Sequence, residues 1–171
     1  MDFFDTVNKR YSYRGEFTEA KISDEDISRI LEAGIKAPSG GNRQTTNFIA
    51  ITDTDLRDEI NTILLHKGIA TAPFLIAVYT EKVLGRNGKE YELQDFGAAM
   101  QTILLASAAL GYSSLWLEGY LYEEGRSEKL AQILGLESKY TVRSVIPIGI
   151  PKTEGKQNDR KPFDERVRFN N

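Results

Sequence analysis

The sequence predicts a single globular domain in which α-helices and β-strands alternate. Its 171 residues, 40% hydrophobic and 27% charged, are enough for one sizeable core and do not require a second domain. Helical periodicity and short apolar runs follow one another along the chain, and residues 91–110 carry small or apolar side chains around most of a helix. We expect one domain over residues 1–171, with residues 151–171 as an extended C-terminal tail.

Composition excludes several classes of function. The formal net charge of -3 and the pI near 5.3 argue against general nucleic-acid affinity. The absence of cysteine excludes disulfides, thiolate zinc sites, iron–sulfur clusters and a cysteine nucleophile. His66 is the single histidine, so paired-histidine metal sites are excluded, and we expect it to have a surface role. No metal site is expected.

The N-terminal residues predict a soluble, cytoplasmic protein. Met1 to Asp5 lack the basic and apolar regions of a signal peptide, and no apolar run is long enough to span a bilayer. Residues 2–10 predict a short amphipathic helix. We expect its apolar side to pack on the core or on a partner.

The segment Arg10-Tyr11-Ser12-Tyr13-Arg14 alternates strictly. In an extended conformation, both arginines and the serine would share one face. Two guanidinium groups beside a hydroxyl suit a phosphate group, because each planar guanidinium offers paired hydrogen bonds as well as charge. The alternative is an exposed basic turn.

The next helix leads into a loop of turn-forming residues. Ser23 and Asp26 predict a capped N-terminus, and helical spacing continues to Ile35. The loop that follows, residues 37–44, contains Pro38, which ends the helix, and then Gly40 and Gly41. It is either a plain turn or a binding site whose hydrogen-bonding side chains are Ser39, Asn42 and Gln44.

The rest of the domain is predicted as further helices and strands. Residues 91–110 should form a helix that is central to the core and also a dimer interface. The other expected elements are a strand at 47–51, a helix from Asp53 that Gly68 ends, a strand at 73–79, a charged, mobile loop at 81–89, a strand at 113–117 that ends in the turn Glu118-Gly119, a helix at 127–134 and a strand at 141–150. The tail carries Phe163, Val167 and Phe169, so we expect it to lie against protein.

The order of these features resembles the FMN-dependent nitroreductase family, with this chain as a short member. The resemblance covers nearly the whole chain and rests on an Arg-x-Ser-x-Arg segment, a Pro-Ser-x-x-Asn-x-Gln loop, the long helix from Asp95, a Leu-Glu-Gly turn and a Pro-x-Gly strand before a basic tail. It implies that FMN is bound by Arg10, Ser12, Arg14, Pro38, Ser39, Asn42, Gln44, Glu118, Gly119, Pro147, Gly149 and Arg160.

The resemblance also implies the architecture. It predicts an α+β fold with an antiparallel-rich central sheet flanked by helices, and a domain-swapped homodimer in which the tail 151–171 packs on the partner subunit. Arg43, Thr45 and Thr46 replace the aromatic or proline residues that often follow the glutamine, which changes the pocket beside the ring. A segment that covers the flavin in longer members is missing, so either the site is open or residues 81–92 form its lid.

Three functions are compatible with these features. The favoured one is an NAD(P)H-dependent flavin oxidoreductase that reduces nitroaromatics, quinones or a similar electron-poor molecule by a ping-pong mechanism, with no catalytic side chain because FMN carries the chemistry. A second keeps the flavin for a related reaction such as reductive dehalogenation. The third is a flavin-binding redox or regulatory protein with little turnover.

Overall fold

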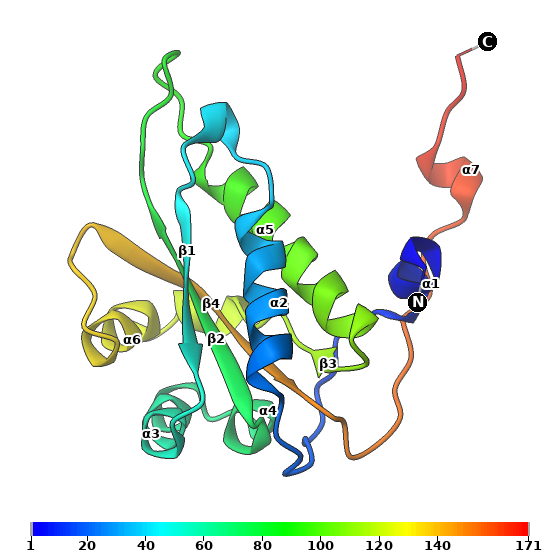
Figure 1. The fold of residues 1–171 in the computed structure, drawn as a ribbon. Coiled ribbons are helices and arrows are strands. Elements are labelled where there is room, and N and C mark those ends of the chain that lie inside the picture. The colour runs from blue at the N-terminus through cyan, green and yellow to red at the C-terminus, as the bar shows by residue number, and fades with distance from the viewer. Residues whose placement is uncertain (1, 171) are drawn as a thin grey trace.

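The computed structural model describes residues 2–170 and has an α+β architecture built on an antiparallel sheet (Figure 1). The sheet has 4 strands in the order β1-β2-β4-β3, and all of its pairings are antiparallel. The strands are β1 (Thr46–Ile51), β2 (Phe74–Glu81), β3 (Ser113–Ser114) and β4 (Tyr140–Gly149). This confirms the predicted fold class and its antiparallel-rich sheet.

Helices cover both faces of the sheet (Figure 1). One face carries α2 (Asp24–Ile35) and α5 (Glu92–Ala109). The other carries α3 (Thr54–Leu64), α4 (Lys67–Thr71) and α6 (Arg126–Ile133). The remaining helices are α1 (Phe3–Lys9), the short 3₁₀ turns η1 (Gly40–Asn42) and η2 (Gly119–Tyr122), and α7 (Phe163–Arg166) in the tail.

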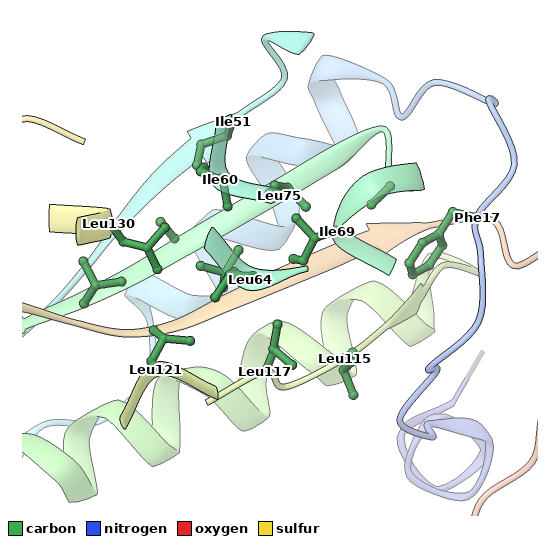
Figure 2. Packing of buried hydrophobic residues seen from close by; sticks show 14 of the residues in the cluster. Phe17, Ile51, Ile60, Leu64, Ile69, Leu75, Leu115, Leu117, Leu121 and Leu130 are labelled. Atoms are coloured by element: carbon green, nitrogen blue, oxygen red, sulfur yellow. The ribbon is translucent and has the colours of Figure 1, made fainter. Parts of the chain in front are cut away.

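The core lies in two layers separated by the sheet. Side chains of β2 alternate between them: Leu75 and Ala77 enter the layer under α3, α4 and α6, whereas Phe74, Ile76 and Val78 enter the layer under α2 and α5. A strand buried on both faces must be apolar throughout, as the continuous run at 73–79 predicted. Figure 2 shows the first layer, into which Leu115, Leu117 and Leu121 also point.

Most predicted elements form within a residue or two of their expected limits. The Ser23 side chain caps α2 by accepting from the Asp26 N–H, as the sequence predicted. Two expectations were wrong. Gly68 does not end the helix that starts after Asp53, because Leu65 takes a left-handed conformation there and a separate helix, α4, contains Gly68.

The second correction concerns residues 113–117, where the strand is only Ser113–Ser114. The chain then leaves β4 and returns to it at a single bridge between Leu117 and Val145. The Val145 N–H donates to the Leu117 carbonyl. Pro147 follows two residues later in β4, so its nitrogen faces the same side of the strand and lies at the gap where the chain has left β4. Proline has no N–H to donate, so it fits where β4 lacks a continuous neighbour.

The tail first packs on its own chain and then leaves it. The Gln157 side chain donates to the carbonyls of Val7 (3.2 Å) and Arg10 (2.8 Å), and Lys152 pairs with Glu16 at 2.9 Å. Beyond this contact, the tail exposes its apolar side chains, Phe163 (66%), Val167 (40%) and Phe169 (72%). Among residues 2–170, no helix combines the length and apolar character needed to cross a membrane.

Candidate functional site

A small cavity beside the first helix gathers four cationic side chains. Its volume is about 50 Å³, and its lining contains no carboxylate. The residues around it are Arg10, Tyr11, Ser12, Arg14, Lys156, Gln157, Asn158 and Arg160. The structure thus brings together the three arginines and the serine that were predicted to hold a phosphate, although they come from opposite ends of the chain.

The predicted alternation explains how the arginines reach this cavity. Tyr13 is buried in the core, and its N–H donates to the Ser114 carbonyl at 3.0 Å, so the segment runs in extended form beside β3. The side chains on the other face therefore point outward. The tail is held close by the Gln157 side chain and by Gly155, where an added Cβ would collide with the Tyr11 ring.

The electrostatics of this group, which we call the cation cluster (Arg10, Arg14, Lys156 and Arg160), favour an anion. Among the described residues, none of the four forms an ion pair with a carboxylate, although the whole chain is acidic. Burial, and then the charge of Arg160, lower the pKa of Arg10. A bound anion would remove this repulsion.

The charge of Arg14, a member of the cation cluster, also acts on His66. Burial, and then the charges of Lys67 and Arg14, lower the pKa of His66. The His66 Nδ1 accepts from the Gly68 N–H at 3.1 Å, and the ring lies edge-on to Tyr120 at 6.0 Å. His66 therefore caps α4, and its ring lies beside Tyr120, the residue after the predicted Gly119.

The loop 37–44 forms a second group at the start of α5. The buried Asp95 carboxylate accepts from the Gly40 N–H (2.7 Å) and from the Thr45 hydroxyl (2.9 Å). Within the loop, the Gln44 N–H donates to the Ser39 hydroxyl oxygen at 3.0 Å. We call these residues, 37–45 with Asp95, the loop cluster. Its Pro38, Ser39 and Gln44 line a separate cavity of about 380 Å³.

The loop cluster holds unusual backbone conformations. Gly41 (φ 62°), Asn42 (φ 55°) and Gln44 (φ 52°) are all left-handed, a conformation that glycine and asparagine adopt readily but that costs a residue such as Gln44 about 1–2 kcal/mol. The amide side chains of Asn42 and Gln44 are exposed and form no hydrogen bond with any described residue. Strained backbone that presents free hydrogen-bonding groups is typical of binding sites, and it favours the second of the two interpretations of this loop.

The two clusters lie at opposite ends of α5 (Figure 1). Gly40 contacts the first turn of α5 through Asp95, whereas Arg10 lines a cavity with Ala108 and Gly111 at the other end. A helix of 18 residues is about 27 Å long at 1.5 Å per residue. A single described chain therefore does not bring Asn42 and Gln44 to the cation cluster.

Two predicted residues, Pro147 and Gly149, are buried in β4 and line none of these cavities. Pro147 pairs with Leu75, and a Cβ on Gly149 would lie 2.8 Å from Pro73 and 2.9 Å from Phe17. In the described chain, these positions shape the strand that supports the site. Their predicted contact with a cofactor stays a prediction.

Sequence reasoning missed several residues that build the site. Lys156 was noticed only as one cation of the basic tail, and no local pattern marked Lys67. Asp95 was noticed only as part of a long helix, yet an acid in the first turn of an otherwise apolar helix was a usable signal. A further cavity of about 630 Å³, lined in part by Phe17, Arg57 and Phe74, contains no predicted site residue.

Comparisons with known proteins identify the family of this chain. The model of the Nitroreductase family matches residues 7–68 and 64–150. A protein of Archaeoglobus fulgidus named "Putative NADH dehydrogenase/NAD(P)H nitroreductase" is 35% identical over 139 residues, which cover 81% of this chain and 79% of the relative.

Solved structures share the same fold. A "putative nitroreductase in complex with FMN" from Desulfovibrio desulfuricans is 29% identical, with a TM-score of 0.83 over 100% of this chain and 98% of its own. An "FMN-dependent Nitroreductase" from Clostridium difficile R20291 is 26% identical, with a TM-score of 0.82 over 98% of this chain and 99% of its own. The match to the family model over most of the chain, together with the relative from A. fulgidus, shows that this protein belongs to the nitroreductase family.

Proposed function

We propose that this protein is an FMN-dependent oxidoreductase that accepts hydride from NAD(P)H and reduces nitroaromatics, quinones or a similar electron-poor molecule by a ping-pong mechanism. The observation that carries the proposal is the cation cluster, in which Arg10, Arg14 and Arg160 share one cavity with no carboxylate. The relatives named as FMN-dependent or as bound to FMN support the identity of the anion.

The residues present fit FMN. The cation cluster would hold the phosphate, with the Ser12 hydroxyl beside it, and guanidinium groups suit phosphate because they offer paired donors. Arg14 and Lys67 would extend the positive field along the edge of the sheet, toward Glu118 and Gly119. Positive charge there favours the anionic form of a reduced flavin.

Bound FMN would supply the redox chemistry, taking hydride from the nicotinamide and passing electrons to the second substrate. The chain's own part is to bind, orient and stabilise charge. Gly119 is exposed, and a Cβ there would meet no atom within 4 Å, so the backbone offers an open surface. Donors fixed in advance where charge develops can each contribute about 3 kcal/mol.

We propose further that the active form is a homodimer in which the loop cluster of one subunit completes the site of the other, with the tail 151–171 packed on the partner. Three observations support this arrangement. The two clusters lie at opposite ends of α5, the tail exposes Phe163 and Phe169, and Gly97 on α5 has no neighbour within 4 Å of an added Cβ. A mid-helix glycine costs about 1 kcal/mol, and close approach of a partner would account for it.

Replacing Gly97 by Leu tests the dimer. An added Cβ at Gly97 meets no atom within 4 Å in the single chain, so we expect the helix content to be retained, whereas the interface should separate and bound FMN should fall. Light scattering measures the molar mass of the protein in solution, and the ratio of flavin absorbance to protein absorbance measures the FMN content. Glu59→Leu on the exposed side of α3 is the matched control. A wild-type protein that is monomeric at micromolar concentration with FMN bound would contradict the proposal.

The spectrum of the purified protein tests the function as a whole. Bound oxidised flavin is yellow, should bleach rapidly with NADH or NADPH, and should recover its colour with a nitroaromatic or quinone. Slow, unselective bleaching would favour a flavin-binding redox or regulatory protein. Selective recovery with a halogenated phenol would favour reductive dehalogenation.

A further inference from the structure

The Glu118 carboxylate is held at both oxygens by aromatic side chains from its own segment. The Trp116 Nε1–H donates to Oε2 at 2.8 Å, and the Tyr122 hydroxyl donates to Oε1. We call these three residues the Glu118 clamp. Glu118 is half-buried and directly precedes the exposed Gly119.

The geometry of the clamp follows from the alternation of side chains along this segment. Leu115 and Leu117 point into the core layer under α3, α4 and α6 (Figure 2). Trp116 and Glu118 therefore share the opposite side, where the indole ring packs edge-on against Phe96 of α5 at 5.5 Å. The turn η2 reverses the chain, so that the Tyr122 hydroxyl reaches the same Glu118 carboxylate.

The backbone around Glu118 is fixed on both sides. The Leu117 carbonyl accepts from the Val145 N–H (3.2 Å) and from the buried Ser144 hydroxyl (3.0 Å), and the Glu118 carbonyl accepts from the Leu121 N–H at 2.8 Å. By contrast, the N–H groups of Glu118 and Gly119 have no acceptor among the described residues. The segment thus presents two rigidly held donors without partners.

Burial does not force this arrangement on Tyr122, which is 65% exposed. Its hydrogen bond to Glu118, then burial and the negative charge of that carboxylate, raise the pKa of Tyr122, so the phenol keeps its proton and remains a donor at neutral pH. An exposed tyrosine contributes little to the core, which leaves the carboxylate as its main partner.

We propose that Trp116 and Tyr122 are positioning residues, which hold Glu118 so that the N–H groups of Glu118 and Gly119 face the cofactor ring. This inference rests on the proposed function, since it requires a flavin beside the segment. The two residues act through Glu118 and not by contact with the ring. The backbone hydrogen bonds of Leu117 and Glu118 hold the segment, and the clamp adds a restraint through the Glu118 side chain on the orientation of the donors and hence on their effect on negative charge at the ring.

Tyr122→Phe is the decisive variant because it removes one hydroxyl from an exposed side chain and should leave the fold intact. Trp116→Phe removes the other donor but also part of the packing on Phe96. Glu118→Gln keeps one oxygen acceptor and should be intermediate. Tyr112→Phe is the matched control, since it removes an equivalent 2.8 Å bond to a carboxylate, that of Asp26, away from the segment.

We expect Tyr122→Phe and Trp116→Phe to retain FMN, because the phosphate contacts are unchanged. The visible spectrum and the midpoint potential of the bound flavin should shift, and the rate constant of its reduction by NAD(P)H should fall about tenfold, the effect of losing one hydrogen bond to a charged group. The melting temperature is measured in parallel. Tyr112→Phe should leave spectrum, potential and rate unchanged.

The outcomes separate the two proposals. A yellow wild-type protein that NAD(P)H reduces, with Tyr122→Phe and Trp116→Phe identical to it in spectrum, potential and rate, would overturn the positioning role and leave the proposed function standing. A wild-type protein that binds no FMN would overturn both. Equal shifts in Tyr112→Phe and Tyr122→Phe would show a general effect on the fold and would also overturn the positioning role.

Discussion

The loop cluster and the cation cluster use polar groups in opposite ways. At the start of α5, the Asp95 carboxylate satisfies the Gly40 N–H and the Thr45 hydroxyl, so the loop backbone is held within one chain. At the other end, Arg10 and Arg160 line one cavity that contains no carboxylate. The first arrangement stabilises the fold, whereas the second opposes it until an anion binds.

This difference separates stability from binding in a way that can be measured. A buried carboxylate with charged hydrogen bonds contributes to the free energy of unfolding, and its loss leaves donors unpaired. Cations without a carboxylate partner, which make only hydrogen bonds to nearby carbonyls, contribute little to the free chain, so their removal should affect folding little and ligand affinity strongly. Substitutions in the two clusters should therefore have effects on different observables.

The largest effect is expected from Arg10→Ala with Arg14→Ala. Each lost guanidinium removes hydrogen bonds worth about 2 kcal/mol to a charged group, so FMN affinity should fall about 1000-fold. The melting temperature should stay level or rise, because the repulsion between Arg10 and Arg160 disappears. The FMN content of purified protein and a fluorescence titration measure the first effect.

A matched control for this double variant is Arg29→Ala with Lys129→Ala, which removes the same charge from exposed helical positions. It should retain stoichiometric FMN. If the Arg10 and Arg14 double variant also retained stoichiometric FMN, the cation cluster would not be the phosphate site, and the comparison between the clusters would lose its basis.

Asp95→Ala should produce the largest loss of stability. Two donors, one of them on the buried Thr45, lose a charged acceptor, which costs about 3 kcal/mol and lowers the melting temperature by about 6–12 °C in a domain of this size. The loss of stability in Asp95→Asn should be smaller than in Asp95→Ala, because the amide keeps one oxygen acceptor. Asp55→Ala, an exposed acid in the first turn of α3, is the control. An unchanged melting temperature in Asp95→Ala would contradict the assigned role.

A smaller effect is expected from Gln44→Gly, which should raise the stability of the fold and weaken the binding of FMN. Gln44→Gly relieves a left-handed conformation worth about 1–2 kcal/mol, offset by about 0.5–1 kcal/mol of extra chain entropy. The variant should be slightly more stable, yet bind FMN about fivefold more weakly if the amide contributes one hydrogen bond. Leu65→Gly, at another left-handed position, should gain stability without losing affinity. Unchanged FMN affinity in Gln44→Gly would remove the loop from the site.

The sequence predicted the elements of both clusters but not their separation. The alternation from Arg10 to Arg14 and the cap at Ser23 are local patterns, and local patterns determine local structure, so both were confirmed. That Arg160 would join Arg10, or that Asp95 would hold Gly40, depends on contacts between residues far apart in the chain. The prediction that Gly68 ends the helix was wrong. Glycine commonly ends helices, but α3 ends at its C-cap, Leu65, which adopts a left-handed conformation.

The smallest expected effect is a change in the pKa of His66, which is also the most direct measure of the positive charge around it. His66 is the single histidine, so NMR titration of its ring reports one group. Burial first, and then Lys67 and Arg14, should hold its pKa below the ordinary 6.5. A lowered pKa means that the folded state favours the neutral ring. The resulting stability is complete above the unfolded pKa and is lost as pH falls from there through the folded pKa.

Protonation would in addition convert Nδ1 from an acceptor to a donor and break the cap on the Gly68 N–H, so acid should loosen α4. Arg14→Ala should raise the pKa of His66, and so should saturating FMN, because either change reduces the net positive charge near the ring. Arg29→Ala should leave it unchanged. A pKa at or above 6.5 in the free protein, or one that does not respond to Arg14→Ala, would show that the cationic field does not reach His66, and the site would then end at the phosphate cavity.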